Sequence, residues 1–298
     1  MPSSANYADL APLRHDVSLA GFTTLGIGGS ADLFFEPQKP EQLADLLTRL
    51  EADGQDFHLL GGGANTLFPD EGMRRPVVHT GSMRRLFRDG PGLRSWPGVT
   101  LQALVRTAME LGLSGVEDLV GVPGQVGGAL AMNAGSASWG LWDEVEEVVL
   151  WVPGLREGLK IEAHPPEAIG PGYRNGNLKG AVVLEVLLAL EETTREAVKA
   201  KQDDILRRKN ASQPVRLASA GCAFRNPEGD SAGRLLDTAG MKGRRVGRAE
   251  VSERHANFIV NRGGATATEV LSLMEEMQQA VEATHGVRLH RELRVVAP

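Results

Sequence analysis

The sequence predicts an α+β fold, and three observations favour it. Residues 31–65 show the order strand, helix, strand and glycine loop, which is typical of a βαβ-like unit. Residues 146–190 carry short β-like runs that alternate with turns. The length of 298 residues, at about 150 residues per domain, predicts two domains, and 42% apolar residues are enough for their cores.

The first elements are a strand over residues 31–37 (ADLFFEP) and a helix over residues 40–54 (PEQLADLLTRLEADG). Four leucines recur at helical spacing and predict the buried face of this helix, which Gly54 ends: Leu43, Leu46, Leu47 and Leu50. A short apolar strand, FHLL, follows and runs directly into Gly61, Gly62 and Gly63. The unit therefore ends in a turn of the size that holds a phosphate.

The middle of the chain begins with a helix from Thr100, its N-cap, to Gly112. Its apolar face is predicted at Leu104, Val105, Ala108 and Leu111. Residues 119–142 then contain no charge, but six glycines and a proline exclude a membrane helix there. Strands are expected in EEVVLWVP and in AVVLEVLLAL, where Glu185 is a single charge in an otherwise buried pattern.

Residues 191–210 are highly charged and helix-prone, and we expect them to form a solvent-facing connector between two domains. The final helix begins at the capping box Thr266–Glu269 and ends at Gly286. Its inward positions are Val270, Leu273, Met274, Met277 and Val281. Residues 287–296 alternate with period two, which predicts a strand with Glu292 on its polar face.

Composition narrows the class of protein. The 32 Lys and Arg against 38 Asp and Glu give a net charge of -6, so no global basic field attracts nucleic acid or an anionic membrane. A single cysteine forms no internal disulfide, and the first 30 residues lack a secretory signal. We expect a cytoplasmic protein, a monomer, that contacts neither nucleic acid nor membrane.

Two glycine loops are candidate anion sites. In residues 61–68 (GGGANTLF) main-chain N–H groups can converge on a diphosphate, and Asn65 or Thr66 can add side-chain hydrogen bonds. The alternative is a plain turn after a strand. In residues 121–135 a helix can open with its first amides towards an anion, or its glycines can serve helix–sheet packing. Neither loop matches a P-loop or a dinucleotide fingerprint, but two loops suit a long, two-ended ligand.

Two further residues stand in small-residue turns. Arg174, in GYRNGN, could grip a carboxylate with its planar donors, or be a solvated charge. Cys222, in SAGCAFRNP, taken alone is most simply a buried apolar residue. It has no Cys or His partner at ligand spacing, so no metal site is expected.

Taken together these runs resemble the flavoenzyme family of UDP-N-acetylenolpyruvoylglucosamine reductases. The resemblance is carried, in chain order, by FTTLGIGGSADLFFEP, LLGGGANTLF, GVPGQVGGALAMNAG, PGYRNG, SAGCAFRNP, AGMKGRRVGRAEVSERHANFIVN and GVRLHRELRV. It covers nearly the whole chain and points to the compact subtype, type II, that lacks an extra substrate-covering loop.

The resemblance implies a vanillyl-alcohol-oxidase/PCMH-type FAD-binding fold over residues 1–190, with subdomains of about 1–75 and 76–190. A smaller α/β substrate domain over 191–298 would follow, and its C-terminal tail could pack back on the first. NADPH would reduce FAD, and the reduced flavin would give a hydride to UDP-N-acetylglucosamine enolpyruvate, yielding UDP-N-acetylmuramate for peptidoglycan synthesis. The enzyme class implied is UDP-N-acetylmuramate dehydrogenase.

The resemblance also assigns residues. Arg174 would neutralise the substrate carboxylate, and Glu292, protonated through a raised pKa, would donate a hydrogen bond to the same developing charge. Cys222 stands where the family usually has the serine that donates a proton to C2, and Gly176 stands where it often has serine. The FAD positions are Gly61, Gly62, Gly63, Ala64, Asn65, Thr66, Gly127, Gly128 and Ala129. The substrate positions are Asn226, Lys242 and His255.

Two alternatives stay open from the sequence. One keeps the flavin fold for an oxidase or dehydrogenase of another small substrate, although hydride abstraction from an alcohol calls for a base rather than a proton donor. The other is a nucleotide-sugar-binding module without turnover.

Overall fold

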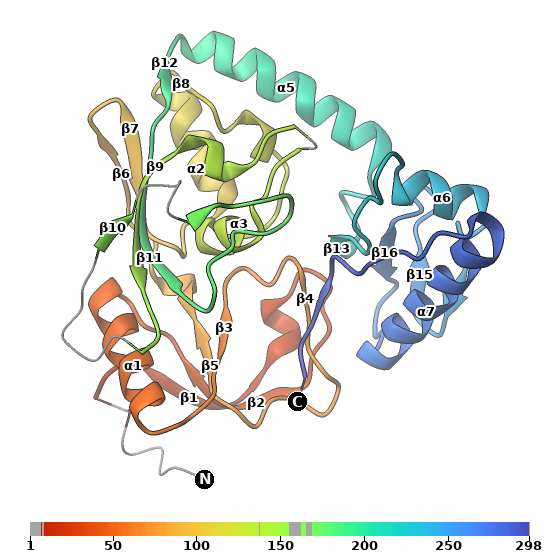
Figure 1. Ribbon diagram of the computed structural model, residues 1–298, viewed down its shortest axis with the longest axis horizontal. Helices are drawn as coiled ribbons and strands as arrows, with labels where there is room; N and C mark the ends of the chain where they lie inside the picture. The colour runs from red at the N-terminus through yellow and green to blue at the C-terminus, as the bar shows by residue number, and fades with distance from the viewer. Residues whose placement is uncertain (1–6, 8, 137, 155–161, 165–168, 298) are drawn as a thin grey trace. The chain divides into compact units, whose positions relative to one another are not determined.

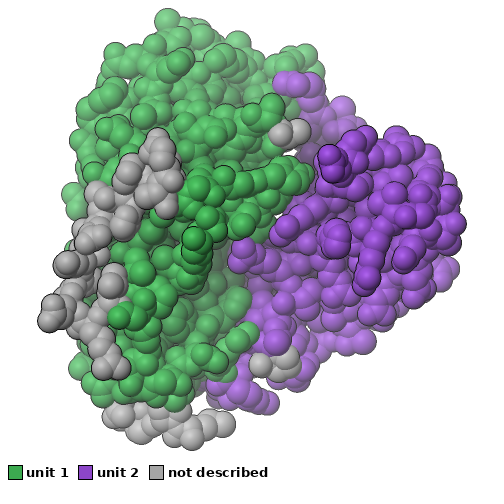
Figure 2. Space-filling view, viewed as in Figure 1, with its two compact units in different colours: residues 1–15, 33–62, 75–207 green, residues 16–32, 63–74, 208–298 purple. Residues whose placement is uncertain are grey.

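The computed structural model describes residues 7, 9–136, 138–154, 162–164 and 169–297. The chain falls into two compact units, each built from separate stretches of sequence (Figure 2). Unit 1 comprises Met1–His15, Leu33–Gly62 and Arg75–Arg207, and unit 2 comprises Asp16–Asp32, Gly63–Arg74 and Arg208–Pro298. The FAD-binding domain expected over residues 1–190 and the substrate domain expected over residues 191–298 stay predictions.

A four-stranded sheet forms in the N-terminal part of the chain, in the order β1-β2-β5-β3. Its strands are β1 (Leu13–Ser18), β2 (Ser30–Phe35), β3 (His58–Leu60) and β5 (Val77–His79), and β5 pairs in parallel with β2 and β3. Helix α1 (Pro40–Ala52) begins with a proline at N1 and buries the four leucines of the predicted face. The expected order of strand, helix, strand and glycine loop is confirmed.

Helices α2 (Leu101–Glu110) and α3 (Val126–Met132) belong to unit 1. Helix α2 begins as predicted, because Thr100 Oγ1 accepts a hydrogen bond from the Ala103 N–H at 3.2 Å. Leu111 lies one residue beyond α2 and is 39% exposed, so its predicted place on the buried face was wrong. Helix α3 is short and ends at Asn133, whose φ of 43° is left-handed.

A five-stranded antiparallel sheet gives unit 1 its largest layer, in the order β10-β9-β11-β7-β6. Its strands are β6 (Leu86–Asp89), β7 (Gly92–Ser95), β9 (Val145–Trp151), β10 (Glu162–His164) and β11 (Val182–Leu188). The predicted charge inside β11, Glu185, accepts hydrogen bonds from Arg94 Nη1 and Trp96 Nε1, each at 3.0 Å. These donors compensate for the partial burial of its carboxylate.

The charged stretch is helical as predicted. Helix α5 (Arg195–Ser212) buries only Val198 and Gln202. Before it, β12 (Glu191–Glu192) pairs with β8 (Leu113–Ser114), and Lys201 Nζ donates to Ser114 Oγ at 2.9 Å. The boundary between the two units falls within this helix, after Arg207.

Unit 2 contains an antiparallel sheet, in the order β13-β16-β15-β14, with helices packed beside it (Figure 1). The strands are β13 (Ala218–Cys222), β14 (Arg245–Val246), β15 (Ala249–Val251) and β16 (Phe258–Asn261). Helix α6 (Ala232–Thr238) contacts α7 (Ala267–His285), which packs on β14 and β15. The capping box at Thr266, the inward residues of α7 and its end at Gly286 are all confirmed.

The continuous strand predicted over residues 287–296 was wrong. Only β17 (Arg294–Val295) is a strand, and it pairs in parallel with β4 (Thr66–Leu67). Leu289 and Leu293 are buried as the alternation requires, but Val295 is 40% exposed and Val296 is buried instead. The alternation fails because the main chain before β17 forms bonds with residues 223–225 and then changes partner to β4.

The part of the chain that the structure describes also contains the short 3-10 helices η2 (Leu19–Phe22), η3 (Thr80–Ser82), η4 (Glu117–Leu119) and η5 (Leu141–Glu144). Among the described residues, no helix combines the length and apolar character needed to cross a membrane.

Candidate active site

The first glycine loop follows β3 directly, and close packing explains two of its glycines. A Cβ on Gly62 would lie 2.8 Å from Gly124 Cα. Gly63 has a φ of 57°, and a Cβ there would collide with the carbonyl oxygen of Phe22. A side chain at either position would displace main chain, so these glycines are required by the turn itself.

The end of this loop is joined to the C-terminal segment. Asn65 Nδ2 donates to the Glu292 carbonyl oxygen at 3.1 Å, and the Arg294 N–H donates to the Asn65 carbonyl oxygen at 3.2 Å. Thr66 is paired with Arg294 in the β4–β17 ladder. The loop that sequence analysis assigned to the cofactor therefore also holds the main chain of the predicted catalytic glutamate.

The second glycine loop leads into α3 as predicted. A Cβ on Gly127 would lie 2.7 Å from Pro97 Cβ, so packing explains this glycine. A Cβ on Gly128 would meet no described atom within 4 Å, and Ala129 is 5% exposed. Of these three positions, only Gly128 presents main chain beside open space.

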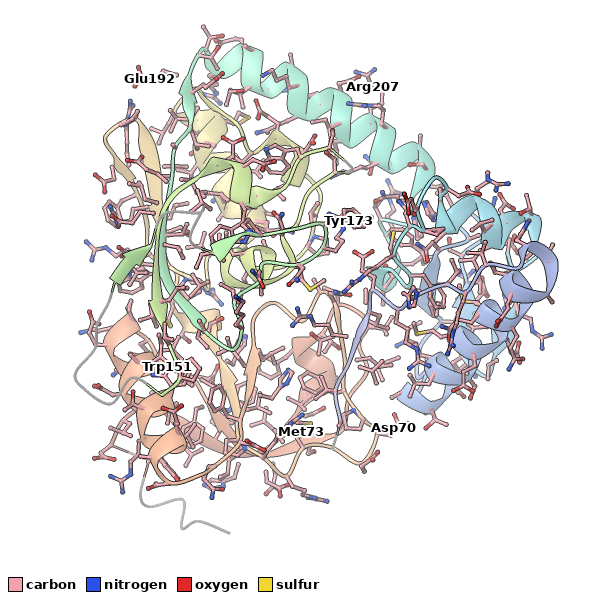
Figure 3. The ribbon with its side chains drawn as sticks, in the orientation of Figure 1. Asp70, Met73, Trp151, Tyr173, Glu192 and Arg207 are labelled. Atoms are coloured by element: carbon pink, nitrogen blue, oxygen red, sulfur yellow. The ribbon has the colours of Figure 1, made fainter. Side chains whose placement is uncertain are left out.

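Arg174, in unit 1, is held in an unusual conformation. Its φ is 52°, a left-handed value that costs free energy in a residue other than glycine. Its Nη2 donates to the Gly135 carbonyl oxygen at 2.9 Å, and its Cζ lies 5.0 Å from the ring centroid of Tyr173, which is 47% exposed (Figure 3). The guanidinium is thus oriented by two contacts rather than loosely solvated.

Close packing explains why position 176 is glycine, where the family often has serine. A Cβ at this position would collide with the Leu130 carbonyl oxygen. The Gly176 N–H also donates to the Ala131 carbonyl oxygen at 3.1 Å, which draws the two main chains together. A serine here would require α3 and the Arg174 turn to separate.

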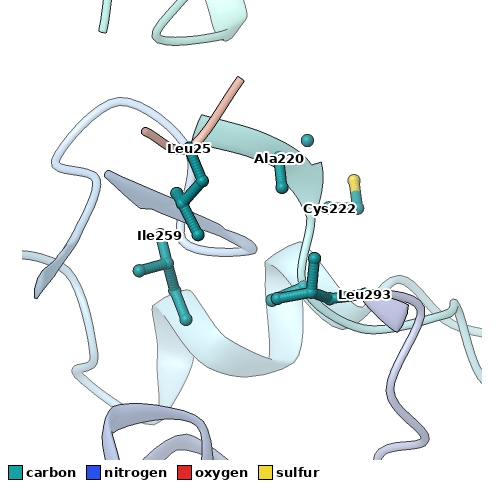
Figure 4. A pocket seen from close by; sticks show the side chains of 7 residues that line it. Leu25, Ala220, Cys222, Ile259 and Leu293 are labelled. Carbon is teal, nitrogen blue, oxygen red and sulfur yellow. The ribbon is translucent and has the colours of Figure 1, made fainter. Parts of the chain in front are cut away.

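Cys222 ends β13 in unit 2 and is partly exposed. It lines a recess of about 10 Å³ with mostly apolar neighbours, among them Leu25, Ile259 and Leu293 (Figure 4). This volume accommodates about one water molecule. The recess beside the thiol is therefore too small to hold the substrate.

Glu292 is brought next to the Cys222 segment through main-chain bonds within unit 2. Its N–H donates to the Ala223 carbonyl oxygen at 2.8 Å, and the Arg225 N–H donates to the His290 carbonyl oxygen at 2.9 Å. The structure thus places two of the three predicted catalytic residues on bonded neighbouring segments of unit 2, whereas Arg174 belongs to unit 1.

The three predicted substrate residues all lie in unit 2, and each has an internal contact. Asn226 Oδ1 accepts from the Ala232 N–H at 3.1 Å, and Lys242 Nζ donates to Asp237 Oδ2 at 2.6 Å. His255 Nδ1 accepts from the Asn257 N–H at 3.2 Å, which leaves the ring proton on Nε2. Burial and the charge of Lys242 lower the pKa of His255, so the ring is neutral at pH 7.

Comparison with known proteins identifies the family. Residues 213–296 match the C-terminal domain of UDP-N-acetylenolpyruvoylglucosamine reductase, and residues 31–153 match an FAD binding domain. The chain is 40% identical over 291 residues to UDP-N-acetylenolpyruvoylglucosamine reductase 2 of Symbiobacterium thermophilum, covering 96% of this chain and 93% of that one. The chain belongs to the UDP-N-acetylenolpyruvoylglucosamine reductase family.

Other members of this reductase family give the same result. The chain is 41% identical over 280 residues to the reductase of Heliobacterium modesticaldum, covering 92% of this chain and 87% of that one. The crystal structure of the reductase (MurB) from Thermus caldophilus superposes with a TM-score of 0.82 at 37% identity, covering 96% of this chain and all of that one. The predicted family, the α+β fold with an FAD-binding domain and the oxidoreductase class are confirmed.

Sequence analysis missed two polar residues that the structure places around the site in this member of the family. Asn257 is 1% exposed and binds the main chain next to Cys222, and Thr24 carries a buried Oγ1 near Gly63. Asn257 lies in the run HANFIVN that carries the resemblance, where it stands as a polar residue between His255 and the apolar run FIV. Thr24 lies in the run FTTLGIGG that carries the resemblance, but its residue type does not single it out, because threonine is common in turns of this kind.

Proposed function

We propose that this chain reduces UDP-N-acetylglucosamine enolpyruvate to UDP-N-acetylmuramate in peptidoglycan precursor synthesis, using bound FAD and NADPH. Its relatives over more than nine-tenths of the chain carry the name of this reductase. The structural observation that carries the proposal is the hydrogen bond from the Glu292 N–H to Ala223, the residue after Cys222. It puts an acidic thiol and a carboxyl group on adjoining main chain, as a reduction that needs one proton and one charge stabiliser requires.

The residues of the first glycine loop fit FAD. Asn65 Oδ1 and Thr24 Oγ1 are buried, and neither has a hydrogen-bond partner among the described residues. Asn65 Nδ2 already binds Glu292, so the remaining atom of this amide accepts hydrogen bonds only. A ring N–H or a hydroxyl of the cofactor supplies such a donor, whereas a diphosphate does not. The diphosphate would instead bind main-chain N–H groups of the loop and of Gly128.

Bound FAD, once reduced by NADPH, supplies the hydride that adds to the terminal carbon of the enolpyruvyl double bond. That addition leaves negative charge on the substrate carboxylate, which Arg174 would neutralise. Because Gly135 and Tyr173 already orient its guanidinium, little side-chain entropy is lost when the carboxylate binds.

Cys222 would complete the reduction by giving its Sγ proton to C2 of the substrate, and solvent would then return a proton to the thiolate. Thiols have a reference pKa of about 8.5, so the thiol is a stronger acid than the serine alcohol usual in the family. Glu292, in its protonated form, would donate a hydrogen bond to the charged carboxylate while this proton is transferred.

The UDP part of the substrate would bind in unit 2 through Asn226, Lys242 and His255. Lys242 would act as a point charge on the diphosphate, exchanging Asp237 for the ligand. His255 Nε2–H would serve as a neutral donor, because Asn257 occupies Nδ1. We further propose that the enzyme works as a cytoplasmic monomer, without nucleic acid or membrane partners.

The test is an anaerobic half-reaction experiment on the purified holoenzyme. NADPH should bleach the visible absorbance of the flavin in a first step. UDP-N-acetylglucosamine enolpyruvate should then restore it, with UDP-N-acetylmuramate as product, while simple alcohols and ketones should not. A flavin that reoxidises equally with and without this substrate would refute the proposal.

A further inference from the structure

The pairing of β13 with β16 is irregular immediately before Cys222. Ser219 pairs with Val260, and Cys222 pairs with Phe258. Between these pairs β13 has two residues and β16 has one, so β13 carries a bulge of one extra residue, where Gly221 has a φ of 76°. A bulge re-aims the side chain that follows it, and here that side chain is Cys222.

Asn257 closes the gap that follows the bulge. Its side-chain Oδ1 accepts from the Phe224 N–H at 3.0 Å, and its Nδ2 donates to the Phe224 carbonyl oxygen at 2.8 Å. Its own carbonyl oxygen accepts from the Ala223 N–H at 2.8 Å. One buried residue thus holds three main-chain groups of the two residues that follow Cys222.

The other edge of the same segment is bound to the C-terminal segment. Phe224 forms an antiparallel bridge with Arg291, with flanking bonds from the Glu292 N–H to Ala223 and from the Arg225 N–H to His290. In this pattern the N–H and C=O of Phe224 point away from Arg291 and towards Asn257. The Cys222 segment is therefore held on one edge by the Glu292 segment and on the other by a side-chain amide.

An asparagine is needed for this role because the location is buried. Ala223 is 3% exposed, Phe224 is fully buried and Asn257 is 1% exposed. An apolar side chain at position 257 would leave the Phe224 N–H and C=O buried without these partners, which is costly. The amide offers one donor and one acceptor at the spacing of a peptide group, so it makes the two hydrogen bonds to Phe224 that a neighbouring strand would otherwise make.

We propose that Asn257 is a positioning residue for proton transfer: it fixes the main chain after the bulge and so sets where the Cys222 thiol stands relative to the Glu292 segment. This inference rests on the proposed role of Cys222 as proton donor. Asn257 does not touch the substrate carbon in this scheme, and it acts only through Cys222. Losing it should therefore affect proton transfer to C2 while leaving flavin reduction by NADPH unchanged.

The test compares Asn257→Ala with Asn261→Ala, a matched control at the other end of β16, which begins directly after Asn257. Asn261 also binds main chain through its amide, to Leu25, Gly263 and Ala265, but not to the Cys222 segment. Both variants lose comparable hydrogen bonds, so both should lower thermal stability. Asn257→Asp, which is isosteric and in its protonated form keeps both an acceptor and a donor for Phe224, serves at mildly acid pH if the alanine variant does not fold.

The first readout is the alkylation rate of Cys222 by iodoacetamide, which needs no activity and is specific because the chain has one cysteine. We expect Asn257→Ala to raise this rate roughly tenfold, because the segment opens more often. The second readout is stopped-flow reoxidation of the reduced flavin by substrate, whose rate should fall roughly 10- to 100-fold with little change in KM. Asn257→Asp should lie between wild type and Asn257→Ala.

Equal behaviour of Asn257→Ala and Asn261→Ala in both readouts would overturn the proposal. A raised alkylation rate with wild-type reoxidation would reject the donor role of Cys222 and with it the catalytic part of this inference. Slow NADPH reduction in Asn257→Ala would likewise contradict it, because that step does not use the thiol.

Discussion

The N–H of Glu292 donates to the carbonyl oxygen of Ala223 at 2.8 Å, although the two residues come from distant parts of the sequence. This bond makes the position of the C-terminal glutamate depend on the segment that carries Cys222. A third partner, Asn65, binds the Glu292 carbonyl oxygen at 3.1 Å. The peptide groups on both sides of Glu292 are thus fixed before any ligand binds, which favours a preorganised site.

Two variants of Cys222 should distinguish the effect of a weaker proton donor from the effect of having no donor at this position. Cys222→Ser should keep the reaction with a loss of roughly tenfold, since the alcohol is a weaker acid but occupies the same place. Cys222→Ala should slow substrate-dependent flavin reoxidation by roughly 10²- to 10⁴-fold, the usual contribution of a general acid. Stopped-flow absorbance measures both rates. Wild-type reoxidation in Cys222→Ala would show that another group donates the proton.

Arg174 combines a strained main chain with an oriented guanidinium. Arg174→Gly should lower kcat/KM by at least roughly 10²-fold while changing the free energy of unfolding by no more than about 1 kcal/mol, because glycine accepts the left-handed φ. Arg174→Lys keeps the charge but loses the planar pair of donors, so it should recover only part of the activity. Steady-state kinetics and urea unfolding together test this. A large stability loss in Arg174→Gly would contradict the explanation by strain.

His255 should make unit 2 sensitive to mild acid. Burial, helped by the charge of Lys242, lowers its pKa below 6.5 in the folded state. The unfolded chain therefore takes up the proton first, and stability falls as pH drops through 6.5 until the folded-state pKa is reached. Urea unfolding at pH 7.5 and 5 should show a larger loss for wild type than for His255→Gln. The reverse order would mean that His255 is charged in the folded enzyme.

Asp70 caps the longest helix of unit 2 from outside that helix (Figure 3). Its carboxylate accepts from the Ala267 and Thr268 N–H groups at 2.7 and 3.0 Å and from Thr268 Oγ1 at 2.9 Å. Burial raises its pKa, but these three donors outweigh burial and hold the pKa below its ordinary value. Asp70→Ala should reduce the free energy of unfolding by about 1–2 kcal/mol, as the loss of a helix cap does.

Two comparisons test this explanation of Asp70. Asp70→Asn retains one acceptor oxygen and should lose less stability than Asp70→Ala in chemical unfolding. The stabilisation should also disappear in acid, since a carboxyl group whose pKa is lowered on folding loses its contribution as pH falls below about 3.9. Equal stability of Asp70→Ala and wild type near pH 7 would exclude the capping role.

Local signals explain which parts of the fold could be predicted. Helix signals such as the caps Thr100 and Thr266 and the leucines of α1 act within one or two turns of their own helix. A short stretch of sequence therefore contains everything that determines where these helices form. The strand over residues 287–296 could not be predicted correctly, because its partners change from residues 223–225 to β4 within a few residues. A period of two shows which side chains can share one face of a strand, but it does not show which distant segment pairs with that strand.

The same distinction applies to the site. Motif resemblance assigned Arg174, Cys222 and Glu292, and the geometry adds what orients each of them. The role of Asn257 could not be predicted, because its side chain binds the main chain of Phe224. Residue types do not show which main-chain groups need a side-chain partner. The sequence shows only that Gly176 departs from the family's usual serine. The structure gives the reason, because a Cβ at this position would collide with the Leu130 carbonyl oxygen.

The pairing of β17 with β4 has a consequence for synthesis on the ribosome. Unit 2 uses residues 16–32 and 63–74 together with residues 208–298, and its parallel ladder closes only at Arg294 and Val295. During translation the N-terminal pieces of unit 2 must therefore wait, with Leu67 not yet packed in the core that it shares with residues 220–293, until Arg294 and Val295 have been made. The need for chaperones should accordingly last until the residues of this ladder have left the ribosome.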